Sequence, residues 1–115
     1  MMLNVIIDDK VSVDALSAAV RTTKEELAQS AGLGRDAVMR SSRSESPGTQ
    51  KRLREMTEIL QRIEAWAGSP LAAYAWYRSS PLPGFGERTA EMLVREGRAD
   101  AVRRYLDEVA LGGFA

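Results

Sequence analysis

The sequence predicts an all-α protein, and three observations support that fold class. Side chains that cap helices precede several segments in which apolar residues recur every three or four positions. Glycine or proline stands where these segments end, as is typical of helix termini. The one strand-like run is Val5 to Ile7, and a single strand cannot form a sheet.

The N-terminal part predicts a lobe of short helices. Three are expected, over residues 13–20, 24–30 and 35–40. Ser12 is suited to cap the first helix, and Thr23 with Glu26 forms a capping box for the second. Gly32 closes the second helix because glycine adopts the left-handed conformation that a tight turn requires. We therefore expect two consecutive helices joined by a glycine turn.

A long helix is expected to follow a polar loop. The serine-rich run 41–46 predicts the loop, and Ser46 before Pro47 is a helix start with proline in the first turn. Apolar residues then mark one face of a helix that reaches Gly68; they are Leu53, Met56, Leu60, Ile63 and Ala67. This helix is the longest element that the sequence predicts.

The C-terminal part predicts three more helices around a rigid connection. The expected helices cover residues 71–78, about 89–96 and 98–110, and the connection contains Pro81, Pro83, Gly84 and Gly86. Thr89 caps the second of these helices and Gly97 ends it. The last helix carries Val102, Leu106 and Val109 on one face.

Composition limits the chemistry of the chain. Its 115 residues suffice for one compact domain, or for two small lobes that share a core. The absence of cysteine excludes disulfides and thiolate sites, and the absence of histidine removes the commonest metal ligand and general base. We therefore expect no catalytic residue, no metal and no cofactor. No apolar run is long enough to span a bilayer and no secretory signal is evident, so we expect a cytoplasmic protein.

Charged and aromatic residues are distributed unevenly. The chain balances 16 basic against 16 acidic residues, yet residues 35–54 hold six basic and two acidic side chains, a local net charge of +4. Residues 1–65 contain no aromatic side chain. All seven lie in the second half: Trp66, Tyr74, Trp76, Tyr77, Phe85, Tyr105 and Phe114. The sequence thus predicts a basic N-terminal lobe, residues 1–65, and an aromatic C-terminal lobe, residues 66–115.

Ala28, Gly32 and Val38 carry a resemblance to a known DNA-binding motif. Their order and spacing, a small residue, a turn glycine and an apolar anchor, resemble the helix-turn-helix of phage-repressor-like (Xre-type) domains across residues 12–65. Such domains place their third helix in the major groove of operator DNA. By this resemblance the DNA-contacting residues are Arg35, Asp36, Met39, Arg40, Arg43 and Lys51, with Gly34, Arg52 and Arg54 beside them. Ser41 departs from the family, which usually has an apolar anchor there.

The aromatic half carries a second, more specific resemblance. Trp76 is followed by the Pro81–Gly86 connection, the Thr89–Gly97 helix and a terminal Gly112-Gly113-Phe114. This order resembles the toxin-binding domain of the MbcA/ParS/Xre antitoxin family over much of residues 66–114. The chain departs at Ala90, where the family commonly has proline.

The resemblance implies a type II antitoxin that covers the active-site entrance of a RES-domain toxin, an enzyme that degrades NAD. It also implies a homodimer within a hetero-oligomer, and repression of the protein's own operon. The expected toxin-binding residues are Trp76, Tyr77, Arg78, Leu82, Phe85, Gly112, Gly113 and Phe114. Hydrolysis and phosphorolysis of NAD both stay open, because that chemistry belongs to the toxin.

Two alternatives compete with this interpretation. One is that Trp66, Trp76 and Tyr105 are core residues, which replace the aromatic side chains that the N-terminal half lacks. The whole chain can also be a stand-alone helix-turn-helix transcriptional regulator whose aromatic lobe is a dimerisation module. Neither interpretation makes the chain an enzyme.

Overall fold

The protein, as a computed structural model, is described over residues 3–111, with only the backbone described for Ser41 and Ser42. Gly112, Gly113 and Phe114 lie outside the described residues. The helices are α1 Val13–Ala19, α2 Lys24–Ser30, α3 Asp36–Met39, α4 Ser41–Ser44, α5 Pro47–Ala67, α6 Pro70–Ser79, α7 Ala90–Arg95 and α8 Ala99–Ala110. A hairpin of β1 Ile6–Ile7 and β2 Lys10–Val11 precedes them. The prediction of an all-α protein is confirmed.

The predicted helix caps are present. In each case a hydroxyl oxygen accepts a hydrogen bond from the backbone N–H three residues later, at Ser12, Thr23, Ser46, Ser69 and Thr89. These bonds satisfy donors that the first turn of a helix leaves unpaired. At the other end of α5, Gly68 adopts a left-handed conformation with φ of 100°. Capping side chains therefore set where α1, α2, α5, α6 and α7 begin, whereas α3 and α8 begin without one.

The N-terminal strand has a partner, which corrects the sequence prediction. Ile6 pairs with Val11 and Ile7 with Lys10, across a turn in which Asp8 and Asp9 have positive φ. Aspartate tolerates that conformation, which the apolar pattern alone did not reveal. The amide of Gln50 on α5 exchanges two hydrogen bonds with the backbone of Val11, of 2.8 and 3.1 Å. The hairpin is thereby fixed to the long helix.

The third helix is shorter than predicted, and the polar loop after it is partly helical. Helix α3 ends at Met39, and Arg40 is extended with ψ of 132°. A separate turn of helix, α4, follows where a loop was expected. The side-chain amide of Gln50 donates a 2.8 Å hydrogen bond to the carbonyl of Ser44 and so fixes the end of α4. The break after Met39 coincides with the missing apolar anchor at Ser41.

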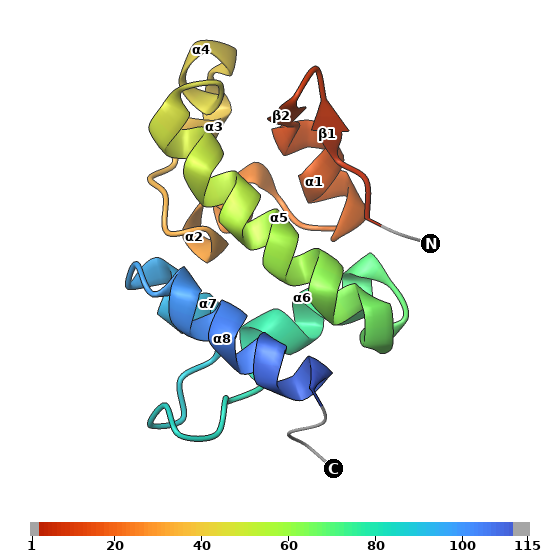
Figure 1. The fold of residues 1–115 in the computed structure, drawn as a ribbon. Coiled ribbons are helices and arrows are strands. Elements are labelled where there is room, and N and C mark those ends of the chain that lie inside the picture. Colours follow the sequence, from red (N-terminus) through yellow and green to blue (C-terminus); the bar gives the residue numbers. More distant parts are fainter. Residues whose placement is uncertain (1–2, 112–115) are drawn as a thin grey trace.

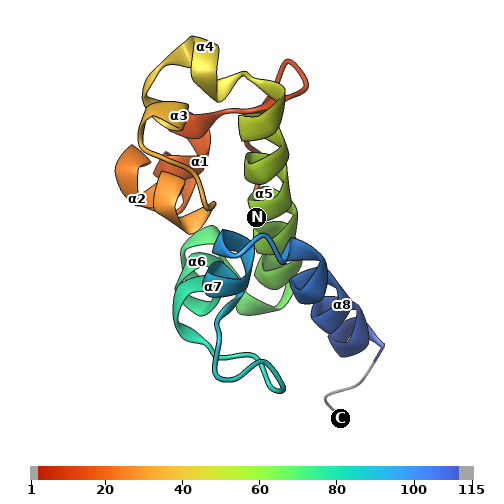
Figure 2. The same ribbon diagram turned by 90° about the vertical axis from the view of Figure 1, so that its left-hand side faces the viewer.

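Helix α5 passes through both halves of the molecule (Figure 1). Its buried face holds Leu53, Met56 and Leu60, which belong to one core together with residues from both lobes. Helices α1 to α4 lie around its first half, and α6 to α8 around its second, as the turned view also shows (Figure 2). The lobe boundary predicted at residues 65/66 falls in the last turn of α5. The two lobes therefore share this helix.

A buried hydrogen-bond network joins the end of α2 to the C-terminal lobe. The hydroxyl of Tyr77 donates to the carbonyl of Ser30 at 2.6 Å. The Ser30 hydroxyl lies 2.8 Å from that of Tyr74 and donates to Glu91 at 2.5 Å. Arg78 pairs with the same Glu91 oxygen at 3.2 Å. Buried polar groups need such partners, so the network holds the lobes in one relative position.

No helix in the described part of the chain is long and apolar enough to cross a membrane.

Candidate functional site

An apolar groove, here called the α8 groove, lies on the C-terminal lobe. It has a volume of about 350 Å³ and is lined by Trp66, Trp76, Pro81, Pro83, Tyr105 and Val109. Two neighbouring hollows share Val109 with it: one adds Phe85, Ala101, Arg104 and Glu108, the other Arg62, Ala65, Leu106 and Ala110. The α8 groove thus continues along one side of α8 in both directions.

Trp66 is the most exposed aromatic side chain described in the groove. It stands in the last turn of α5, and 51% of its surface is accessible. Its ring meets that of Trp76 edge to face, with centroids 5.2 Å apart and planes at 86°. This contact fixes the orientation of an indole that would otherwise rotate freely. A large, oriented and exposed aromatic ring is typical of an interface anchor.

The proline-rich connection forms the opposite wall of the groove. Its backbone is held by the 2.9 Å hydrogen bond from the N–H of Leu82 to the carbonyl of Arg88, and by bridge pairing between Pro81 and Thr89. The Leu82 side chain is 1% exposed and anchors the connection in the core. The prediction of a non-helical connection is confirmed. Because the connection is fixed, little conformational entropy is lost when a partner binds against it.

Helix α8 supplies the floor of the groove. Val102 and Leu106 face the core, while Tyr105 and Val109, four residues apart, lie one step around the helix and line the groove. The Tyr105 phenol is uncharged at neutral pH, as tyrosine ordinarily is, and burial raises its pKa further. Arg62 pairs with Asp107 at 2.6 Å beside the groove. The result is an uncharged apolar floor next to an ion pair.

The residues expected to bind a toxin do not all lie on the surface of the structure. Trp76 and Phe85 are half-buried and line the α8 groove or its neighbouring hollow. Tyr77 and Leu82, however, are 0% and 1% exposed, so they support the surface from beneath and present no contact area. Arg78 is exposed but belongs to the network around Glu91. Gly112, Gly113 and Phe114 lie outside the described residues.

The core interpretation of three aromatic residues is only partly correct. Trp76 and Tyr105 pack against the core, but the expectation for Trp66 is wrong because its ring is half exposed. The sequence also did not predict that Pro81, Pro83 and Val109 line the α8 groove. The i, i+4 spacing of Tyr105 and Val109, beside the Val102 and Leu106 stripe, is a signal that could have found the floor of the groove.

The residues expected to contact DNA lie on the surface of the N-terminal lobe. Arg35, Asp36, Met39, Arg40, Arg43 and Lys51 are all exposed. None of the basic side chains in this set has an ion-pair partner among the described residues. Arg52 corrects the expectation, because its guanidinium turns inward and donates a 2.9 Å hydrogen bond to the carbonyl of Val94. The local excess of positive charge therefore remains available to a partner, apart from that of Arg52.

The glycine turn between α2 and α3 has the expected conformation. Gly32 has φ of 74°, and both Ala28 and Val38 are buried on either side of it. The spacing that predicted two packed helices is therefore confirmed. Helix α3, at four residues, offers a short surface to any major groove.

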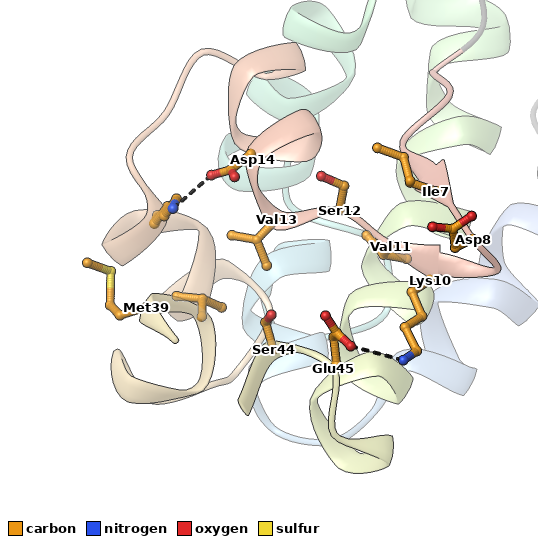
Figure 3. Close-up of a pocket in the computed structure, with 12 residues that line it drawn as sticks. Ile7, Asp8, Lys10, Val11, Ser12, Val13, Asp14, Met39, Ser44 and Glu45 are labelled. Carbon is orange, nitrogen blue, oxygen red and sulfur yellow. Dashed lines mark hydrogen bonds and ion pairs between the residues drawn. The ribbon is translucent and has the colours of Figure 1, made fainter. Parts of the chain in front are cut away.

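A polar pocket of about 400 Å³ lies between the hairpin, the start of α1 and α3 (Figure 3). Lys10 pairs with Glu45 at 3.1 Å beside it, and Lys24 pairs with Asp14 at 2.7 Å. No group of residues in the described part of the chain could hold a metal ion. Four of its charged side chains are thus paired with one another, and Asp8 is the remaining charged residue of the lining.

Comparison with known proteins identifies the lobe that carries the α8 groove. Residues 61–112 match the family model of the antitoxin Xre/MbcA/ParS C-terminal toxin-binding domain. This segment belongs to that domain family. No curated protein and no solved structure matches the chain. The family resemblance inferred from Trp76 and the Pro81–Gly86 connection is thereby confirmed.

Every residue that lines the groove and its two neighbouring hollows lies within the toxin-binding domain. The family supports an antitoxin role, a toxin as partner and a non-enzymatic mode of action. The match begins at residue 61, inside α5, and does not extend to α1, α2 or α3. The helix-turn-helix resemblance of the N-terminal lobe therefore stays a prediction.

Proposed function

We propose that the protein is the antitoxin of a type II toxin–antitoxin system and that it binds a RES-domain, NAD-degrading toxin through the α8 groove. The observation that carries this proposal is the open apolar groove, with Trp66 half exposed at its edge, inside a toxin-binding domain. The RES class of toxin follows from the family resemblance of the sequence.

The groove suits a partner that buries it. An exposed tryptophan stabilises a complex when a partner removes it from water, and its fixed orientation limits the entropy lost on binding. Because the floor is apolar, a partner's side chain can enter the groove without leaving a charged group buried and unpaired. Inhibition by this route is steric: the antitoxin covers the entrance to the toxin's active site and needs no catalytic residue.

Co-expression tests the proposal. The chain is produced with the protein of the adjacent reading frame, the complex is purified, and NAD consumption by the toxin is measured with and without antitoxin. Trp66→Ala is expected to raise the dissociation constant of the complex about tenfold or more, a loss of about 1.4 kcal/mol. Inhibition of NAD consumption should weaken in parallel.

Leu71→Ala is the matched control, because Leu71 is also a large exposed apolar residue, at 44%, and does not line the groove. It should leave binding unchanged. Equal effects of Trp66→Ala and Leu71→Ala would overturn the assignment of the groove. A toxin that binds but does not consume NAD would overturn the RES class and leave the antitoxin role in place.

A second function, DNA binding by the N-terminal lobe, is favoured by the unpaired basic residues beside α3. Arg35, Arg40 and Arg43 are exposed and can bind phosphates or base edges with their planar guanidinium groups. Binding to the protein's own operator would repress its operon. The double variant Arg35→Ala, Arg40→Ala should abolish an operator shift and leave toxin inhibition intact.

A homodimer within a hetero-oligomeric complex is the third part of the proposal. The molar mass of the chain alone, and of its complex with toxin, tests it by light scattering. If Trp66→Ala converts a dimer of the isolated chain into a monomer, the α8 groove joins two copies, and the protein is better described as a transcriptional regulator with a dimerisation lobe.

A further inference from the structure

Arg52 of α5 and Arg95 of α7 meet at the turn between α2 and α3, and Arg35 stands at the end of that turn. A methyl group placed on Gly32 would lie 3.1 Å from the Cα of Arg95 and 3.4 Å from a guanidinium nitrogen of Arg52. Arg35 follows three residues after Gly32 and is exposed. We call Arg35, Arg52 and Arg95 the turn patch. It joins the N-terminal lobe to α7 of the toxin-binding domain.

The positive charge of the turn patch is not neutralised by its neighbours. Arg95 stands in the last turn of α7, is exposed and has no ion-pair partner among residues 3–111. Two acidic side chains of the same helix turn are occupied elsewhere: Glu91 binds Arg78 and Ser30, and Glu96 binds Arg88 at 2.9 Å, so neither pairs with Arg95. The patch therefore presents at least two free guanidinium groups, of Arg35 and Arg95, to a negatively charged partner.

The position of the patch favours DNA as that partner. A helix in a major groove is flanked by the two phosphate backbones, so residues beside the turn that precedes it stand over phosphates. Helices α2, α3 and α7 share the side of the molecule that faces the viewer in Figure 2. The α8 groove involves Val109, fourteen residues beyond Arg95 and near the far end of α8. A toxin bound in the α8 groove therefore need not contact the turn patch.

We propose that Arg95 binds a backbone phosphate of the DNA duplex that the N-terminal lobe contacts, so that the DNA-binding surface extends onto the toxin-binding domain. This inference rests on the proposed DNA-binding function. Arg52 contributes by position: its hydrogen bond to Val94 holds the end of α7 against the α2–α3 turn and so sets where Arg95 stands.

Fluorescence anisotropy with the full chain and a duplex of about 30 base pairs, three helical turns, from upstream of its reading frame tests the inference. Affinity is measured between about 50 and 200 mM salt for the wild type and for Arg95→Ala, Arg95→Lys, Arg35→Ala and Arg104→Ala. Arg104 is the matched control, because it is an exposed arginine of the same domain that lines a hollow beside the α8 groove.

Arg95→Ala should weaken binding about five- to tenfold and lower the slope of log K against log salt concentration by about 0.9, the loss of one phosphate contact. Arg95→Lys should retain most of the affinity because it retains the charge. Arg104→Ala should behave as the wild type. Thermal unfolding of each variant shows whether the fold is intact. If the alanine variant is unstable, Arg95→Gln, which removes the charge but keeps a long polar side chain, takes its place and should show the same loss of affinity and slope.

Three results would overturn the inference in distinguishable ways. If Arg35→Ala weakens DNA binding but Arg95→Ala changes neither affinity nor slope, the inference fails and the DNA-binding function stands. If the wild type does not bind the duplex, both fail. Loss of toxin binding in Arg95→Ala, with DNA binding unchanged, would assign the turn patch to the toxin interface and would also overturn the inference.

Discussion

The two lobes of this protein have surfaces of different chemical character. The N-terminal lobe contains no aromatic side chain, and most of the basic residues of segment 35–54 are exposed without an acidic partner. In the C-terminal lobe aromatic rings reach the surface, and Arg78, Arg88 and Arg103 pair with carboxylates, while Arg95, Arg98 and Arg104 form no ion pair with a described residue. One lobe presents net charge, and the other presents apolar area.

This difference indicates which kind of partner each lobe can bind. Unpaired charge acts over several ångströms, is weakened by salt and suits a phosphate backbone. Apolar area acts only on contact, is insensitive to salt and suits a shaped protein surface. The binding of each partner should therefore respond differently to ionic strength, although both surfaces are built on the same helix, α5.

The largest expected effect tests whether the lobes unfold separately. Leu27→Ala removes a fully buried side chain from the N-terminal lobe, and Leu93→Ala does the same in the C-terminal lobe. Each should lower the free energy of unfolding by about 2–5 kcal/mol. Because both lobes pack on α5, each variant should still show one cooperative transition by circular dichroism and by tryptophan fluorescence. Two separated transitions would show that the lobes are independent.

The next effect concerns the buried contact between Tyr77 and Ser30. Tyr77→Phe removes the hydroxyl that donates to the Ser30 carbonyl and leaves that acceptor unpaired, so stability should fall by about 1–3 kcal/mol. Urea unfolding at neutral pH measures this change. Ser79→Ala, which removes an exposed hydroxyl of the same helix, is the control and should have a much smaller effect.

The same phenol predicts how stability depends on pH. Burial, followed by the charge of Glu91, raises the pKa of Tyr77 well above 10 in the folded protein. Above about pH 10 the unfolded chain loses this proton while the folded protein keeps it, so stability should fall as pH rises further. In Tyr77→Phe this part of the decline should be missing. An unchanged alkaline decline in the variant would assign it to other groups.

The smallest expected effect distinguishes the contributions of Arg52 and Arg54, both on α5, to stability. Arg52→Ala removes the hydrogen bond to the Val94 carbonyl and should cost about 1–2 kcal/mol. Arg54→Ala removes an exposed side chain that forms no ion pair with a described residue and should change stability by less than about 0.5 kcal/mol. Equal losses in thermal unfolding would mean that Arg52 does not hold the two lobes together.

Much of the fold could be predicted because the signals are local. Ser12, Thr23, Ser46, Ser69 and Thr89 each bind a backbone N–H three residues away, so the helix starts follow from neighbouring residues. The hairpin was missed because its turn depends on two aspartates with positive φ and its position depends on Gln50, about forty residues later. Contacts at that sequence distance leave no periodic pattern.

The location of the candidate site was predicted better than its residues: Trp76 and Phe85 were expected and line the groove or its neighbouring hollow, whereas Trp66 was not. The family resemblance placed toxin binding in the right lobe, and composition showed that aromatic residues gather there. Composition could not separate Tyr77, which is buried, from Trp66, which is half exposed. Both are large rings on helices, and burial is decided by which neighbouring element covers them. Likewise, only the fold shows that Arg95 stands beside Gly32.

The shared helix also determines how the protein can be divided for experiments. A fragment beginning at residue 61, where the family match starts, would lose most of α5 and leave the inner faces of α6 and α8 uncovered. It would also lose Leu3, whose backbone binds Gln61 and Glu64 near the end of that helix. We therefore expect the matched segment not to fold on its own, and reagents for studying toxin capture should keep the whole chain.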